Sequence, residues 1–158
     1  MSETKAEPTL RLRDAARADL PALLALFEDG GVDAAGSNDL NHASAQWDAI
    51  HRIAHARVLL AEREGRAVGT LTLFILPLLA HGSAPEALVE SVVVHPDERG
   101  RGVGRALMQR AMHIAAEHRC YKLALTSNEQ RSGAHAFYDR LGFRRHGISF
   151  VAAPEMAT

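Results

Sequence analysis

Glycines and arginines alternate over "RGRGVGR", residues 99–105, between an apolar β-branched run and a helical pattern. The charged and flexible positions are Arg99, Gly100, Arg101, Gly102, Gly104 and Arg105. A helix start presents unpaired backbone N–H groups and the positive end of the helix dipole, which together attract an anion. Glycine permits close backbone approach and positive φ, while the arginines add charge at the rim. The segment therefore predicts a pyrophosphate-binding turn between a strand and a helix.

Two familiar phosphate loops do not fit this turn. The dinucleotide fingerprint requires a third glycine where Leu107 stands, and the nucleoside-triphosphate loop requires a Gly-Lys-Ser/Thr sequence that does not follow. On this segment alone, a glycine-rich turn with solvated arginines and no ligand remains an open alternative.

Glu90 is a candidate for proton transfer, because it interrupts the apolar run "EALVESVVV", residues 86–94. Period-two alternation along a strand predicts that Glu90 faces the same side as Val92 and Val94. A carboxylate on a buried strand costs free energy unless it has a partner or a chemical role. We therefore expect Glu90 to act as a general base or to form a salt bridge with a neighbouring helix.

Periodicity along the chain predicts the elements that position these residues. Strands are expected at 9–15, in a hairpin over 57–76, and at 86–94, 121–128 and 143–153, the last as a strand or strand pair; helices are expected at 16–31, 43–56, from 100–104 onward and at 131–141. The long helix shows an apolar stripe at Val103, Leu107, Ala111, Ile114 and Ala115. This order predicts an α/β (α+β) fold with a mixed sheet and helices on both faces.

Composition limits the function classes. The chain has 158 residues, 47% hydrophobic residues and a formal net charge of −1, which favours neither nucleic acid nor an anionic membrane as partner. One cysteine, Cys120, permits no intramolecular disulfide. Pro77 interrupts the most apolar run, and no secretory signal pattern precedes it. We expect a cytoplasmic protein with a disordered tail at 1–8 and one domain at 9–153.

Histidine spacing gives only a weak metal signal. His51 and His55 lie one helical turn apart, but Arg52 stands where a metalloprotease has glutamate, so we expect no metal site.

Two separate blocks carry a family resemblance. Arg99-x-x-Gly102-x-Gly104 after "VVVHP" resembles the acetyl-CoA loop of the GNAT superfamily of N-acetyltransferases, and "AHAFYDRLGF", Ala134–Phe143, resembles the later motif of that family. The resemblance extends from about residue 10 to about residue 151 and implies the GNAT fold, in which a central mixed sheet is splayed and flanked by helices on both faces. It also implies acetyl-CoA as co-substrate.

The resemblance assigns roles residue by residue. Backbone groups of Val92, Val93 and Val94 would bind the pantetheine arm as an added strand would. The turn would hold the pyrophosphate through Arg99, Gly100, Arg101, Gly102, Val103, Gly104 and Arg105. Asn128 would contact the cofactor or serve as a turn residue, two readings that stay open. Tyr138 would protonate the departing thiolate, since a phenol with a pKa of about 10 is protonated at neutral pH.

The acceptor is the least determined partner. The first two helices, the loop before residue 86 and the last strands form the acceptor surface in this family. Those regions carry Glu28, Asp29, Asp33, Asp39, His81 and Glu86, an acidic set that would suit a cationic amine. We expect a small-molecule primary amine, with a protein acceptor or a non-catalytic acetyl-CoA sensor as alternatives. A homodimer stays open.

Overall fold

The computed structural model describes residues 9–152 and residue 154. The expected tail at residues 1–8 lies outside the described residues, as does residue 153 at the end of the expected domain. The chain divides into two compact units, Met1–Leu125 and Thr126–Thr158. The single domain expected over 9–153 stays a prediction.

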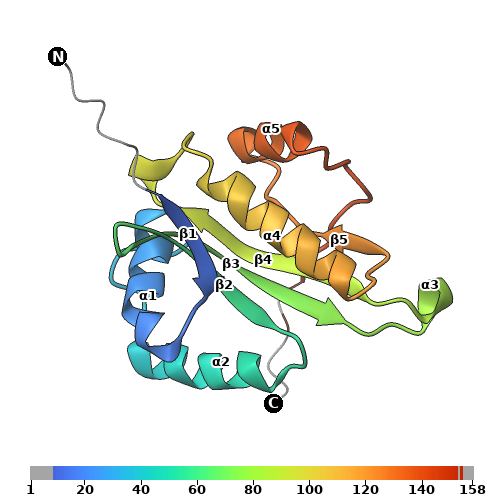
Figure 1. Cartoon of the computed structure of the whole chain (residues 1–158), viewed down its shortest axis with the longest axis horizontal. Helices are drawn as coiled ribbons and strands as arrows, with labels where there is room; N and C mark the ends of the chain where they lie inside the picture. Colours follow the sequence, from blue (N-terminus) through green and yellow to red (C-terminus); the bar gives the residue numbers. More distant parts are fainter. Residues whose placement is uncertain (1–8, 153, 155–158) are drawn as a thin grey trace. The chain divides into compact units, whose positions relative to one another are not determined.

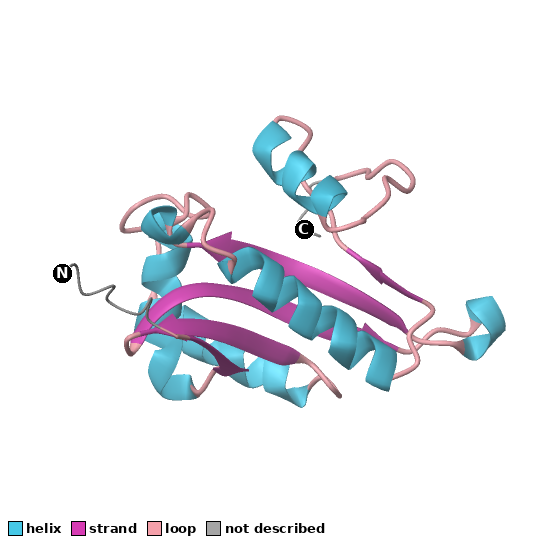
Figure 2. Cartoon of the chain, turned by 45° about the horizontal axis from the view of Figure 1, so that its top comes forward, coloured by secondary structure: helices cyan, strands magenta, loops and turns pink. Residues whose placement is uncertain are grey.

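The first unit contains a five-stranded mixed sheet (Figures 1 and 2). Its strands, in spatial and sequence order, are β1 (Leu10–Asp14), β2 (Arg57–Arg63), β3 (Arg66–Leu76), β4 (Glu86–Val94) and β5 (Lys122–Ala124). The strands β1 to β4 pair in antiparallel fashion, and β5 pairs parallel to β4. The sequence prediction of a mixed sheet is confirmed.

Helices cover both faces of this sheet, as Figure 2 shows. They are α1 (Leu20–Asp29) and α2 (Leu40–Arg52) on one face and α4 (Val103–Glu117) on the other. The short α3 (Ala80–Ser83) lies beyond the end of the sheet in the connection from β3 to β4, and two 3-10 turns are η1 (Arg17–Asp19) and η2 (Pro96–Glu98). On one face, side chains of α1 and α2 form a core cluster with Val58, Leu60 and Val93. On the other face, α4 packs so closely that a Cβ added to Gly69 would lie 2.7 Å from Val103 Cγ1.

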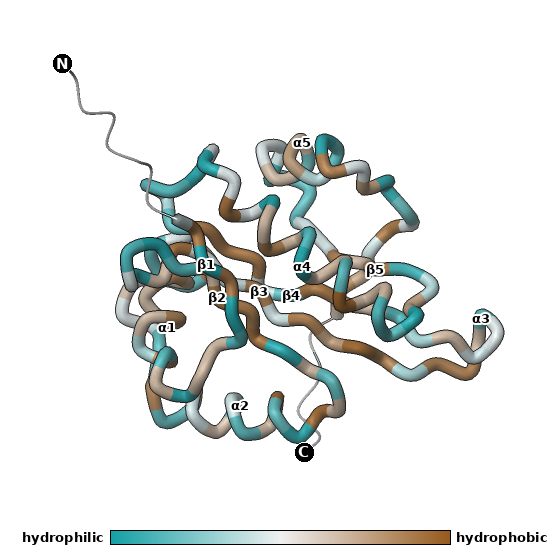
Figure 3. Tube along the Cα trace, viewed as in Figure 1, coloured by the Kyte–Doolittle hydropathy of each residue, from teal (hydrophilic) through white to brown (hydrophobic). Residues whose placement is uncertain are grey.

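Sequence patterns explain the helix limits. The stripe expected on the long helix is confirmed, because every one of its five residues is buried in α4. The second helix begins earlier than the expected residue 43, because Asp39 caps it by accepting hydrogen bonds from the backbone N–H groups of Asn41 and His42. It ends at Arg52 because Ile53 is extended, with ψ 123°. Figure 3 shows hydrophobic residues along the central strands.

The second unit contains α5 (Ser132–Arg140), followed by Gly142 with φ 86° as its expected stop. The final strand expected from residue 143 onward is wrong for the described residues, which adopt no strand between 143 and 152. Ile148 and Phe150 alternate as strand residues do, but both side chains are exposed. Alternation forms a strand only where a neighbouring strand accepts its backbone hydrogen bonds, and no described residue pairs with this segment.

Candidate active site

A β-bulge in β4 changes the direction in which Glu90 points. Thr70 pairs with Val93 and Thr72 pairs with Glu90, so two residues of β3 span three of β4. The extra residue is accommodated at Ser91, whose φ of 53° is left-handed. Since directly paired residues share a face, Glu90 lies on the side of Val93 and the α1–α2 core, whereas Val94 pairs with Gly69 and lies on the α4 side. The expectation that Glu90 shares a face with Val92 and Val94 is therefore wrong.

Glu90 is accessible for chemistry. Its side chain is exposed, and within the part of the chain that the structure describes it has no hydrogen bond or ion pair. The salt bridge with a neighbouring helix, the alternative role for this carboxylate, is not formed by the described residues. A general base needs an accessible lone pair, which this position provides.

The second half of β4 has an open edge toward β5. Parallel pairing joins Glu86 to Lys122, Ala87 to Leu123 and Leu88 to Ala124, and extends no further among the described residues. Among the described residues, Val89, Glu90, Val93 and Val94 pair with β3 and with no second strand. Unpaired backbone groups on a strand edge are the template to which an extended molecule adds as a further strand.

The glycine–arginine turn leads into α4 through two left-handed glycines. Gly100 and Gly102 have φ values of 74° and 79°, and Gly102 is the left-handed residue that precedes α4. No side chain caps the helix, and its first backbone hydrogen bond runs from Ala106 N–H to Gly102 C=O. The N–H groups of Gly102, Val103, Gly104 and Arg105 therefore lack helical acceptors at the start of α4, whereas Arg101 N–H donates to Glu98 C=O at 3.4 Å. A Cβ on either glycine would find open space within 4 Å.

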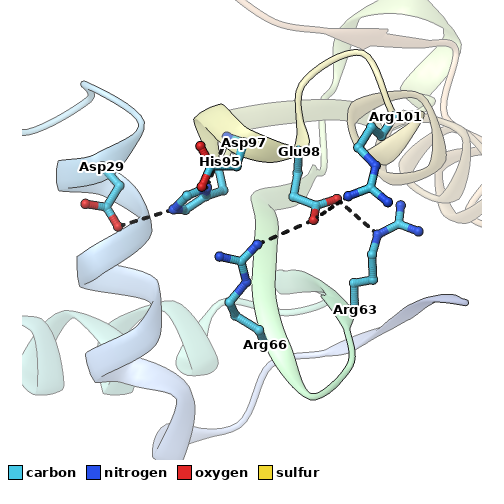
Figure 4. Close-up of polar contacts among 7 residues, drawn as sticks. All are labelled: Asp29, Arg63, Arg66, His95, Asp97, Glu98 and Arg101. Carbon is cyan, nitrogen blue, oxygen red and sulfur yellow. Dashed lines mark hydrogen bonds and ion pairs between the residues drawn. The ribbon is translucent and has the colours of Figure 1, made fainter. Parts of the chain in front are cut away.

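A buried carboxylate that the sequence analysis missed lies directly before this turn. Glu98 is 4% exposed and accepts hydrogen bonds from Arg63 Nε at 3.0 Å and Arg101 Nη1 at 2.9 Å (Figure 4). Arg66 Nη2 donates at 3.4 Å to Oε1, the oxygen that also accepts from Arg101, whereas Arg63 donates to Oε2. We refer to Arg63, Arg66, Glu98 and Arg101 as the Glu98 cluster. The sequence carries no signal for this burial, because "PDERG" has the composition of an exposed polar loop.

The opposite side of the turn contacts the end of α1. Arg99 Nη2 donates to the backbone C=O of Gly30 at 3.4 Å, and His95 Nε2 lies 3.7 Å from Asp29 Oδ2. The backbone of Gly30 also packs closely against the side chain of Val93, because a Cβ added to Gly30 would lie 2.0 Å from Val93 Cγ2. Two of the three arginines expected to add charge at the rim, Arg99 and Arg101, thus donate hydrogen bonds to other groups of the protein.

Two expected site residues belong to the second unit. Asn128 Oδ1 accepts from the backbone N–H of Gln130 at 2.9 Å, which supports its reading as a turn residue. Tyr138 makes edge contacts with the rings of Phe137 and Phe143, at centroid separations of 5.1 and 5.8 Å. Burial raises the pKa of the Tyr138 phenol, partly offset by the charge of Arg131, so this phenol stays protonated at neutral pH.

The acidic lining expected for the acceptor is largely engaged in structural contacts. Glu28 accepts from Gly36 N–H and Asn38 Nδ2, hydrogen bonds that lower the pKa of this carboxyl. Asp39 caps α2, and Glu86 pairs with Lys122 Nζ at 3.4 Å. These contacts leave fewer carboxylates available to attract a cationic amine.

Histidines do not form a metal site in the described chain. His55 lies beyond the end of α2 with φ 63°, its ring against that of His118 at 4.5 Å. His81 stacks on Tyr121 near the start of β4, away from the turn that follows the end of this strand. No group of three or more potential metal ligands occurs in the residues that are described.

None of the helices in the described part of the chain is long and apolar enough to span a membrane.

Known proteins resemble this chain along most of its length. The model of the acetyltransferase (GNAT) family matches residues 18–143. Glucosamine 6-phosphate N-acetyltransferase of Trypanosoma brucei brucei is 38% identical over 57% of this chain and 59% of its own length, so the match spans under two thirds of that relative. The enzyme of the same name from Candida albicans is 27% identical over 90% and 91% of the two chains. The crystal structure of a Trypanosoma brucei acetyltransferase superposes with a TM-score of 0.79 at 30% identity, covering 92% of this chain and all of that one, 100%.

Proposed function

Because the chain belongs to the GNAT family of acetyltransferases, we propose that it transfers the acetyl group of acetyl-CoA to a primary amine of a small molecule. The observation that carries this proposal is the combination, within one unit, of an uncapped helix start after two left-handed glycines and an open strand edge leading to it. A diphosphate and an extended amide-containing arm, both present in acetyl-CoA, match these two features.

The residues of the first unit would bind and orient the co-substrate. The N–H groups of Val103, Gly104 and Arg105, with those of the turn before them, would hold the pyrophosphate. The open edge at Val92–Val94 would pair with the pantetheine amides, and a backbone N–H near Val94 would polarise the thioester carbonyl. Acetyl-CoA supplies the acyl group, so this chain supplies binding, orientation and proton transfer.

Glu90 would prepare the amine for attack. For a lysine-like amine, whose pKa is near 10.4, only about one molecule in 10³ is neutral at pH 7, a deficit of roughly 4–5 kcal/mol; for a less basic amine the deficit is smaller. The exposed Glu90 carboxylate would collect this proton directly or through a water molecule. The free nitrogen lone pair then forms the C–N bond, the C–S bond breaks with its electron pair leaving on sulfur, and the nitrogen releases its second proton to water to give the neutral amide. Tyr138 would protonate that sulfur.

An amino sugar is the acceptor class that we favour. The relatives that align with this chain include glucosamine 6-phosphate N-acetyltransferases, and three of the five acids that would attract a cationic amine, Glu28, Asp39 and Glu86, contact groups of the protein instead. A protein amino group and a sensor without catalysis are the competing functions.

The experiment is a thiol-release screen with acetyl-CoA. The panel includes glucosamine, glucosamine 6-phosphate, an aminoglycoside, a diamino acid and a lysine peptide. Release with one small amine supports the proposal, release with the peptide alone favours a protein acceptor, and binding without release favours the sensor. The Glu90→Gln and Tyr138→Phe variants should lower kcat at least tenfold, an effect typical of general acid–base residues. Tyr121→Phe is the matched control, since Tyr121 is the other tyrosine of the chain.

A further inference from the structure

We propose that Glu98 is a positioning residue for acetyl-CoA: its buried carboxylate fixes the glycine turn against the β2–β3 hairpin and so sets the direction of the N–H groups at the start of α4. This inference rests on the proposed function, because it assigns a role in binding the same co-substrate. Glu98 does not itself contact acetyl-CoA in this account.

The contacts of Glu98 span three elements. Arg63, at the end of β2, donates through Nε at 3.0 Å, and Arg66, at the start of β3, lies 3.4 Å away. Arg101, between the two left-handed glycines, donates through Nη1 at 2.9 Å. Figure 4 shows the guanidinium groups reaching the carboxylate from the hairpin and from the turn. One side chain therefore connects the rigid sheet to the turn.

Burial makes this connection rigid. The side chains of Glu98 and Arg63 are only 5% and 8% exposed, so water competes little for their hydrogen bonds and the pair is screened far less than a surface pair. A charge-assisted bond of this kind is short and directional. The turn itself has no such stiffness, because glycine at positions 100 and 102 leaves its backbone free to rotate.

A second contact holds the turn from the other side. Arg99 Nη2 donates to the C=O of Gly30 at the end of α1. The turn is thus fixed between α1 and the hairpin, and Arg101 and Arg99 point to opposite supports. Preorganised N–H groups bind an anion without paying for their own ordering at the moment of binding. Loss of the Glu98 connection should therefore weaken co-substrate binding without altering the chemical step.

The test compares Glu98→Gln with wild type. The amide keeps the shape of the carboxylate but removes its charge and turns an NH₂ donor toward guanidinium donors. We expect the Kd and KM for acetyl-CoA to rise about tenfold, with kcat at saturating acetyl-CoA and the KM for the amine within twofold of wild type. Glu62→Gln is the matched control, because Glu62 lies on β2 and accepts from Arg13 Nη2 at 2.5 Å without touching the turn. It should leave both acetyl-CoA constants unchanged.

Two further measurements keep the inference falsifiable if Glu98→Gln folds poorly. Arg101→Met removes the contact from the turn and should raise the acetyl-CoA Kd several-fold; combined with Glu98→Gln it should raise Kd by clearly less than the product of the two single effects, since the two residues share one contact. Amide hydrogen exchange without ligand should be faster at residues 101–106 in Glu98→Gln and unchanged there in Glu62→Gln.

The outcomes separate this inference from the proposed function. A wild-type protein that binds no acetyl-CoA refutes the proposed function, and the positioning role falls with it. A wild-type protein that binds, with a folded Glu98→Gln variant of equal Kd, refutes the positioning role alone. A double variant whose rise in acetyl-CoA Kd equals the product of the two single rises would also contradict the positioning role, because Arg101 would then act independently of Glu98.

Discussion

Gly30→Ala tests the contact on which the position of the bulged strand depends. Gly30 follows α1, and an added Cβ would lie 2.0 Å from Val93 Cγ2 and 2.8 Å from the backbone O of Leu26. Ordinary contact begins near 3.4 Å, so the methyl groups must separate by roughly 1.4 Å in a close-packed core. Overpacking of this kind costs about 1–3 kcal/mol.

The net effect is smaller than the overpacking cost, since replacing glycine by alanine reduces the entropy of the unfolded chain by roughly 0.4–1 kcal/mol. We expect the free energy of unfolding to fall by about 1–2 kcal/mol and the Tm to fall by about 2–8 °C in a chain of this length. Urea and thermal unfolding monitored by circular dichroism measure both. Gly133→Ala is the control, because a Cβ there meets nothing within 4 Å.

A double variant decides whether the clash with Val93 is the cause. Val93→Ala alone should cost about 1.5–2 kcal/mol, from the loss of two buried methyl groups. In Gly30→Ala/Val93→Ala the clash with Val93 Cγ2 is absent and only the 2.8 Å approach to Leu26 O remains, so the combined cost should be clearly smaller than the sum of the two single costs. A combined cost equal to the sum of the single costs would refute this packing of α1 on β4.

Other predictions concern the remaining elements of the first unit. Leu107→Ala removes a fully buried side chain of α4 and should cost about 2–5 kcal/mol in urea unfolding; a loss below about 1 kcal/mol would contradict its place in the core. Asp39→Ala removes the cap of α2 and should lower the free energy of unfolding by about 0.5–2 kcal/mol, whereas Asp39→Asn should retain most of the stability that the cap provides. The hydrogen bond from Arg13 lowers the pKa of Asp19, so its contribution is present above the unfolded pKa near 3.9 and is lost as the pH falls through the lower folded pKa. Asp19→Asn should therefore flatten the dependence of Tm on pH below about pH 4, and an unchanged acid limb would contradict this role.

The local part of the architecture was predictable from the sequence. The stripe on α4 repeats at helical spacing, and the glycines of residues 99–105 mark a turn between a strand and a helix, so the helix and the turn both appeared where expected. The extra residue in β4 was not predictable, because Ser91 carries no turn signal and the left-handed φ is imposed by the register with β3. Alternation along the strand therefore assigned Glu90 to the wrong face.

Partners distant in sequence account for the other differences. Glu98 reads as an exposed loop residue until Arg63, which is 35 positions earlier, is seen to reach it. The alternation of Ile148 and Phe150 predicted a strand, but strand formation depends on a neighbour that a single segment does not specify. The pairing of charges such as Glu86 with Lys122 likewise depends on sheet register.

The most direct test of the central claim is a calorimetric titration of acetyl-CoA into the wild-type protein and into Gly102→Val. We expect micromolar binding at one site per chain by wild type. We expect the affinity of Gly102→Val for acetyl-CoA to be at least tenfold lower, because φ at residue 102 is 79° and valine is both strained there and bulky in the open space before α4. Absence of binding by wild type, or equal binding by a folded Gly102→Val variant, would contradict the assignment of this turn as the acetyl-CoA site.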